Sequence, residues 1–115
     1  MTIKWVKSDP VVMNGEPFCY GTRLTVRNLL EMRAAGTPPA RMLAEHPELR
    51  RIGVAEAYLF ASKDPARYAD FIATDGSLIG PGFTADEAAG LPAHLRTAAG
   101  VVTTAGEPTP SAARR

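Results

Sequence analysis

The chain has 115 residues, 45% of them hydrophobic, and its formal net charge at pH 7 is +1. A chain of this length can bury one core but not two, and its composition is ordinary for a soluble globular domain. No apolar run approaches 18 residues and no cationic start precedes an apolar stretch. We therefore expect neither a membrane span nor a secretory signal. The single cysteine cannot form an internal disulfide, which fits a reducing cytoplasm.

The charge is divided unevenly along the chain. Residues 1–63 hold nine Lys and Arg against six Asp and Glu, whereas residues 64–115 hold four against six. A mildly basic front half and an acidic rear half suit a nucleic-acid-binding face followed by a segment held away from it. The net charge alone is too small to require a polyanionic partner.

The N-terminal residues predict short strands. Residues 3–7 form a strand-like apolar run, which Ser8-Asp9-Pro10 ends as a turn. Further along, Asn14-Gly15 lies between two apolar runs, and this dipeptide is a strong hairpin signal because both residues tolerate positive φ. A lone hairpin is not stable in water. We therefore expect these strands either to pair with a second subunit or to fold back on the helices of their own chain.

Residues 21–63 predict three short helices joined by tight turns. We expect the first over residues 26–35, with Thr25 as its N-cap. Gly36 should end this helix, because glycine adopts the left-handed conformation without a Cβ penalty. Short helices that each carry an apolar stripe cross steeply, so the three are expected to form a trihelical helix-turn-helix unit.

The second helix is expected over residues 38–46, with Thr37 as its N-cap and Pro38 at its first position. His46-Pro47 should stop it, because the residue before a proline is pushed out of the helical region.

The third helix is expected from about residue 51 to 62, and it is apolar on nearly every side. A helix that is apolar all round is buried all round. We expect its surface to be covered by a dimer partner or by the C-terminal segment. Few of its side chains are suited to reading base edges.

The rear of the chain has weaker local signals. Asp75-Gly76 between apolar residues indicates a hairpin, and Thr84 with Glu87 forms a capping box that opens a short helix. From residue 100 onward the chain is poor in bulky apolar residues. The sequence thus predicts a mainly α protein in three parts, which are a β-arm with the helix-turn-helix (1–65), a C-terminal extension (66–99) and a disordered tail (100–115).

Two motifs carry a family resemblance. Gly21-Thr22-Arg23, followed at a fixed distance by Gly36-Thr37-Pro38, resembles the domain-of-unknown-function family 433, and the similarity covers about residues 3–65. That family comprises small prokaryotic proteins described as VapB-like antitoxins with a homeodomain-like helix-turn-helix. The resemblance implies a cytoplasmic homodimer that neutralises a PIN-like ribonuclease toxin and binds operator DNA to repress its own promoter. One departure is that residues 49–53 lack the usual Ser, Thr or Asp cap of the third helix.

Basic residues of the helix-turn-helix are the candidate DNA contacts. Each arginine alone is typical of a solvated surface, but their joint placement in this pattern favours phosphate binding. The candidate DNA-binding residues are Arg23, Arg27, Thr37, Arg41, Arg50 and Arg51.

Apolar residues of the extension have two interpretations. In an antitoxin, a weakly ordered segment folds on its toxin and places apolar anchors in the toxin's groove. Alternatively, the same side chains cover the apolar outside of the third helix in their own chain. These residues are Phe71, Ile72, Leu78, Ile79 and Phe83.

Catalysis finds no support in the sequence. Cys19 has no nearby His or basic cluster to lower its pKa, so we expect a packed and inert thiol. His46 and His94 lack metal-ligand spacing, and we predict neither a metal, a cofactor nor a small-molecule substrate. The alternative to the antitoxin is a homodimeric helical protein-interaction module that does not bind DNA.

Overall fold

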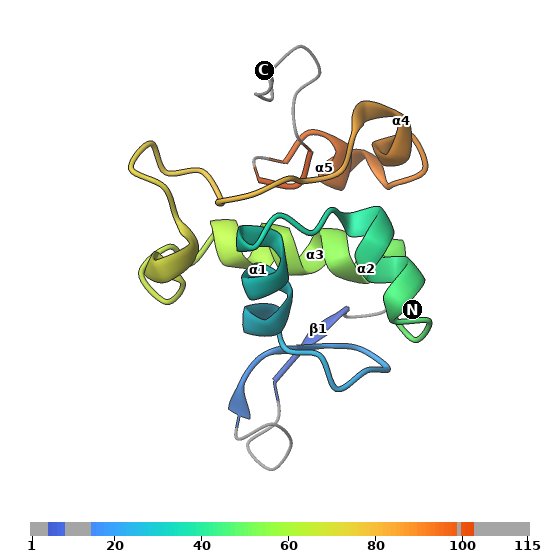
Figure 1. The fold of residues 1–115 in the computed structure, drawn as a ribbon, viewed down its shortest axis with the longest axis horizontal. Helices are drawn as coiled ribbons and strands as arrows, with labels where there is room; N and C mark the ends of the chain where they lie inside the picture. The colour runs from blue at the N-terminus through green and yellow to red at the C-terminus, as the bar shows by residue number, and fades with distance from the viewer. Residues whose placement is uncertain (1–4, 9–14, 99, 103–115) are drawn as a thin grey trace.

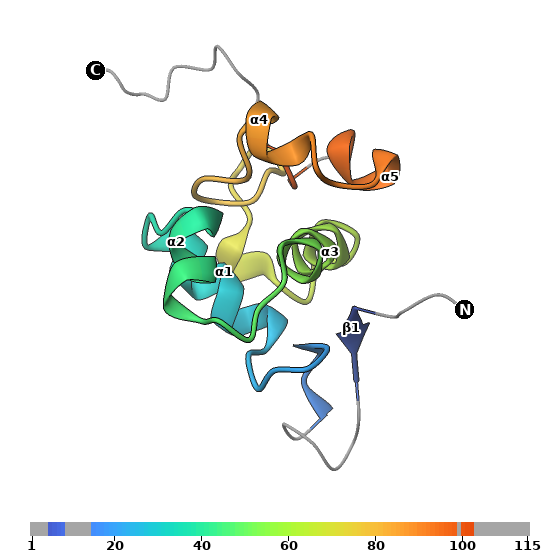
Figure 2. The ribbon, with the colours of Figure 1, turned by 90° about the vertical axis from the view of Figure 1, so that its right-hand side faces the viewer.

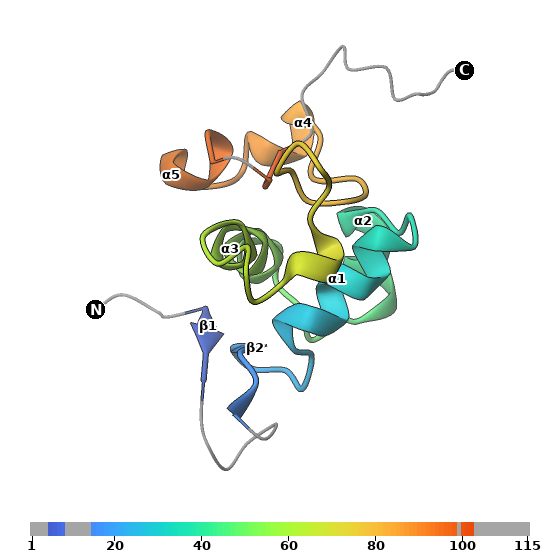
Figure 3. The same cartoon turned by 90° about the vertical axis from the view of Figure 1, so that its left-hand side faces the viewer.

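The computed structural model describes residues 5–8, 15–98 and 100–102, and one central helix organises them. This helix, α3, has the hairpin on one side, the α4–α5 segment on the opposite side, and α1 and α2 against a third face (Figures 1 and 2). The view from the other side shows the same order (Figure 3). The elements are β1 (Val6–Lys7), β2 (Phe18–Cys19), α1 (Val26–Ala34), α2 (Pro39–Glu45), α3 (Arg51–Ser62), the 3-10 helix η2 (Ala69–Phe71), α4 (Ala85–Ala88) and α5 (Ala93–Arg96).

The first and third helices begin and end close to the predicted residues. Thr25 caps α1 through a full capping box, in which its hydroxyl accepts from the Asn28 amide and its own amide donates to the Asn28 side chain. Gly36 follows α1 with a φ of 97°, as a C-terminal glycine should. α3 spans Arg51–Ser62, as expected.

The predicted cap of the second helix is wrong. The N-cap of α2 is Pro38, no side chain caps this helix, and the helix begins at Pro39. The Thr37 amide instead donates to the Met32 carbonyl at 3.0 Å, and the Gly36 amide donates to Arg33 at 2.9 Å. These two bonds form the Schellman motif that closes α1. Thr37 therefore belongs to the end of α1 rather than to the start of α2.

The N-terminal strands fold back on their own chain. β1 and β2 pair antiparallel, with Val6 opposite Cys19, and the Cys19 thiol donates to the Gly53 carbonyl of α3 at 3.7 Å. Trp5 also lies against this helix, since a Cβ added to Gly53 would be 3.7 Å from its ring. Residues 3, 4 and 9–14, including part of the predicted turn, lie outside the described residues.

The opposite side of α3 is covered by the C-terminal extension. Phe83, Leu95 and Val101 are buried with the α3 side chains in one core, and the Phe83 amide donates to the Val101 carbonyl at 2.9 Å. Of the two covers that we considered for α3, the described residues show the one from the same chain. The packed chain continues to Val102, and residues 103–115 of the predicted tail lie outside the described residues.

A buried arginine joins α1 to the extension. Arg33 is only 4% exposed, and its guanidinium lies 4.5 Å from the ring centre of Tyr58. Its Nε donates to the Gly80 carbonyl at 3.2 Å and its Nη1 donates to the Gly100 carbonyl at 2.6 Å. Gly80 approaches so closely, with a φ of 96°, that an added Cβ would clash with the Arg33 backbone. This cross-link holds two distant loops against α1.

Candidate nucleic-acid interface

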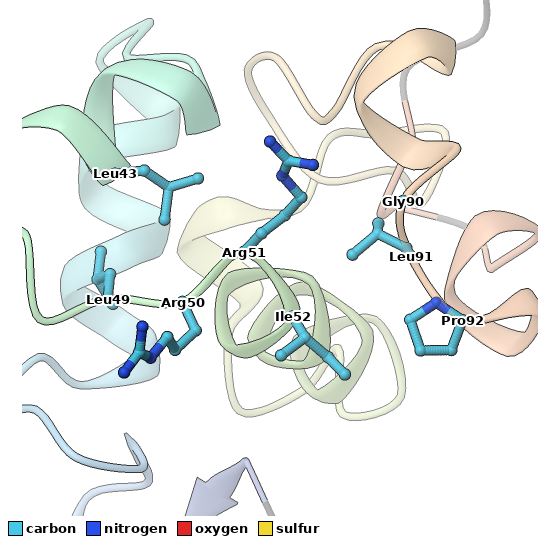
Figure 4. Close-up of a pocket in the computed structure, with 8 residues that line it drawn as sticks. All are labelled: Leu43, Leu49, Arg50, Arg51, Ile52, Gly90, Leu91 and Pro92. Carbon is cyan, nitrogen blue, oxygen red and sulfur yellow. The ribbon is translucent and has the colours of Figure 1, made fainter.

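A groove of about 640 Å³ opens at the N-terminal end of α3 (Figure 4). Its walls come from α2 and the turn after it, from the first residues of α3, and from the connection between α4 and α5. The lining residues are Leu43, Leu49, Arg50, Arg51, Ile52, Gly90, Leu91 and Pro92.

The electrostatics of this end of α3 are positive. Arg50 is the N-cap and makes no capping hydrogen bond, and the first turn contains no acidic residue. The first amides of a helix carry a partial positive charge, here uncompensated by a side chain. Arg50 and Arg51 are both exposed, and neither guanidinium has a hydrogen-bond or ion-pair partner among the described residues. Figure 4 shows Arg51 pointing toward α4 and Arg50 pointing the other way.

The other predicted DNA-binding residues lie in different surroundings. Arg41 is exposed on α2, where its Nε pairs with Glu45 at 2.9 Å. Arg23 is exposed in the loop between β2 and α1. Thr37 lines a separate hollow next to α1, together with Met32 and His46.

Arg27 has a packing role instead. Its guanidinium lies over the rings of Tyr68 and Phe71, at 5.3 and 5.7 Å from their centres, and it donates to the Arg67 carbonyl at 3.3 Å. Through these contacts Arg27 packs against the start of the extension. The structure thus brings Arg50 and Arg51 to the groove and leaves Arg27 and Thr37 outside it.

The body of α3 is enclosed, with Val54, Ala55, Ala57, Tyr58 and Ala61 all fully buried. A helix that reads bases in the major groove must present a free face to the DNA. Only the N-terminal end of α3 projects charged side chains outward at the groove.

The predicted anchors of the extension are mainly occupied within the chain. Leu78 and Phe83 are 5% and 1% exposed and belong to the core. Phe71 and Ile72 are partly buried against that core, and Ile79 is 38% exposed. Leu78 and Phe83 therefore act by self-packing in this fold.

Cys19 and His94 both contact α3. Cys19 is 1% exposed, and burial raises the pKa of its thiol to about 12, so it is the packed thiol that we expected. His94 lies 3.0 Å from the Glu56 carboxylate, which joins α5 to α3. Among the described residues, no three His, Cys, Asp or Glu side chains are grouped to hold a metal ion.

The features that sequence reasoning missed are the cross-link by Arg33 and the packing of Arg27 on aromatic rings. Arg33 did occupy the fourth position of the apolar stripe of α1, and this was the one signal of its burial.

The described residues define a mainly helical class of protein with a small antiparallel hairpin at its N-terminal end. A family model described as a protein of unknown function (DUF433) matches residues 6–61, from β1 to the last turn of α3. Over this stretch the chain matches the model of that family, which confirms the resemblance seen in its motifs. Neither the curated proteins nor the solved structures gave a match. None of the helices described has both the length and the apolar character needed to cross a membrane.

Proposed function

We propose that this protein is the antitoxin of a type II toxin–antitoxin system, acting in the cytoplasm as a homodimer. It binds operator DNA, represses its own promoter and neutralises a PIN-like ribonuclease toxin. The resemblance to VapB-like antitoxins supports this proposal, as does the succession of three short helices, which we interpret as a homeodomain-like unit. The observation that carries the DNA-binding half is the positive N-terminal end of α3. There Arg50 and Arg51 have no ion-pair partner among the described residues, and no side chain caps the first amides.

DNA binding at this end of α3 depends mainly on phosphate contacts. Helix N-termini and guanidinium groups both favour phosphate oxygens. Arg50 and Arg51 are free to make such contacts, and Arg41 joins them if it exchanges Glu45 for a phosphate. Because the body of α3 is enclosed, base-edge contacts are few, and specificity comes from half-site spacing and DNA shape.

Binding to the chain's own upstream DNA at several salt concentrations tests this half. Phosphate contacts make the affinity fall steeply as the salt concentration rises. The double variant Arg50→Ala/Arg51→Ala should make the negative slope of log K against log salt shallower by about 2. Arg96→Ala, at an exposed position of α5, is the matched control and should leave the slope unchanged. Absence of duplex affinity at low salt would rule out the repressor role.

The antitoxin half is tested with the product of the adjacent gene. Co-expression should yield a complex and should rescue cells from that product's toxicity. A co-expressed pair that neither binds nor protects would end this half of the proposal.

A second candidate function is a protein-interaction module without DNA binding. The apolar part of the groove lining favours it, because Leu43 and Ile52 are only partly buried there. Exposed apolar surface of this kind is common at protein contacts. A homodimer that binds partner protein but no duplex would support this candidate over the first.

A further inference from the structure

A second hollow, of about 440 Å³, lies between the hairpin and the start of α3. It is lined by Trp5, Tyr20, Gly21, Glu48 and Arg50. The two rings come from either side of the hairpin pairing, and the Tyr20 amide donates to the Trp5 carbonyl at 2.8 Å. This hydrogen bond holds the backbones of the two residues next to each other.

Two aromatic side chains, Trp5 and Tyr20, line the hollow. Trp5 and Tyr20 meet edge to face, with ring centres 5.9 Å apart and an angle of 81° between the planes. Tyr20 is 47% exposed, which is unusual for a large hydrophobic side chain in this fold. The Lys7 ammonium lies over the Tyr20 ring, 5.1 Å from its centre, and so adds a positive charge next to that aromatic side chain. Aromatic faces with cations next to them are typical of sites that stack nucleobases.

The polar groups of the hollow are a carboxylate and a guanidinium. Glu48 contacts His46 at 4.0 Å and has no closer partner among the described residues. Arg50 has no ion-pair partner among them either. A ligand with N–H donors for Glu48 and a negative charge for Arg50 would complement both groups.

We propose that this hollow binds an unpaired guanine nucleotide of a single-stranded RNA or DNA. Guanine presents two adjacent donors, N1–H and the N2 amino group, which together match one carboxylate. Adenine presents one donor beside an acceptor on the same edge, so Glu48 distinguishes the two purines. The base stacks on Tyr20 or Trp5, and its phosphate contacts Arg50 and Lys7.

This site goes beyond the proposed operator binding. The operator is a duplex whose base edges are paired, whereas the hollow requires a free Watson–Crick edge. The two activities share only Arg50, so each can fail without the other.

Trp5 is the only tryptophan of the chain, so its fluorescence reports on the hollow directly. We expect saturable quenching by guanosine 5′-monophosphate, with at least about fivefold weaker binding of the adenosine, cytidine and uridine monophosphates. Short single strands that contain one guanine, made as RNA and as DNA, then identify the preferred source. The absence of saturable quenching by any of these probes, or equal affinity for all four bases, would overturn the assignment.

Variants separate the two parts of the site. Glu48→Gln should abolish the preference for guanine over adenine, and Tyr20→Leu should weaken binding of every base by about fivefold or more, as expected for a lost stacking surface. Glu31→Gln, at an exposed acid of α1 outside the hollow, is the control and should change neither quantity. Circular dichroism spectra verify that each variant is folded. Unchanged guanine preference in folded Glu48→Gln would refute the proposed role of the carboxylate.

Discussion

Arg33 is the charged side chain among the buried residues that the structure describes. It is 4% exposed and donates to the carbonyls of Gly80 and Gly100, so its charge is compensated by backbone dipoles and by the Tyr58 ring. Burial lowers the pKa of this arginine. Gly80 is exposed and Gly100 is half-buried, so the Gly100 carbonyl depends more on Arg33 for a hydrogen-bond donor.

We expect Arg33→Met to destabilise the protein by about 2–4 kcal/mol, because methionine fills the space but can neither donate to the two carbonyls nor place a positive charge over the Tyr58 ring. Urea denaturation followed by circular dichroism measures this loss. Arg96→Met, at an exposed position of α5, should change the free energy of unfolding by less than about 0.5 kcal/mol. Equal effects of the two substitutions would show that the cross-link is not stabilising.

Two glycines should respond in opposite directions to alanine. Gly53 lies within α3, where an added Cβ meets the Trp5 ring at an ordinary 3.7 Å, so Gly53→Ala should stabilise by about 0.5–1 kcal/mol. At Gly80 the φ of 96° and the contact with the Arg33 backbone leave no room for a Cβ. Gly80→Ala should therefore lower the thermal midpoint, and Gly53→Ala should raise it. A higher midpoint for Gly80→Ala would contradict the close approach.

The buried Cys19 thiol and Tyr58 phenol make the stability of the protein depend on pH in the alkaline range. Burial raises the pKa of Cys19 from 9.0, and that of Tyr58 from 10.0, to about 12 in each case. Between these pH values the folded state retains protons that the unfolded state releases. The contribution of the two groups to the free energy of unfolding is therefore complete below about pH 9 and is lost as pH rises toward 12. Urea midpoints should fall between pH 7.5 and pH 10.5, and Cys19→Ala should reduce that fall. An identical fall in the variant would show that Cys19 does not contribute.

At the scale of single elements, local sequence signals were reliable where the partners lie within a few residues. The caps at Thr25 and Thr84 and the end of α1 at Gly36 follow from short-range hydrogen bonds, and each is present in the structure. The predicted cap at Thr37 was wrong because this residue fits two local motifs, the end of α1 and the start of α2. In the structure it belongs to the Schellman motif that closes α1.

That correction can be tested by a matched pair of substitutions. Thr25→Ala removes a capping box and should destabilise the protein by about 1 kcal/mol. Thr37→Ala keeps the backbone amide that bonds to Met32, so stability should change by only a few tenths of a kcal/mol. Thermal or urea unfolding compares the two variants, and equal losses would restore Thr37 as a cap.

The contacts between residues far apart in the sequence could not be predicted from it. The apolar surface of α3 predicted that a cover exists, but periodicity carries no information on whether it comes from the same chain or from a partner. Arg27 was predicted as a surface or DNA-contacting cation, and only the place of Arg33 in the apolar stripe hinted at its burial. Nothing near either residue along the chain indicates the rings and carbonyls that arrive from residues 58–100. Of the residues that line the candidate groove, the sequence singled out only Arg50 and Arg51 as site residues. Leu91 and Pro92 come to the groove from a distant segment of the chain.

At the scale of the whole molecule, the family match ends at residue 61 but the core does not. Tyr68, Phe83, Leu95 and Val101 are all buried against the family-matched part. A chain that ends at residue 65 should therefore expose one side of α3 and lose its cooperative thermal transition. Differential scanning calorimetry and analytical ultracentrifugation should show a broad transition and self-association. A sharp transition of a monomeric 1–65 fragment would mean that the front part folds alone.

The enclosure of α3 also determines how fast its backbone amide hydrogens exchange with solvent. The hairpin lies over one flank, the extension over another, and α1 with α2 over a third (Figures 1 and 2). In heavy water, small fluctuations of a loop or a terminus release only the amide hydrogens of that segment. The middle turns of α3 would be the last to take up deuterium, at a rate set by the opening of the entire molecule.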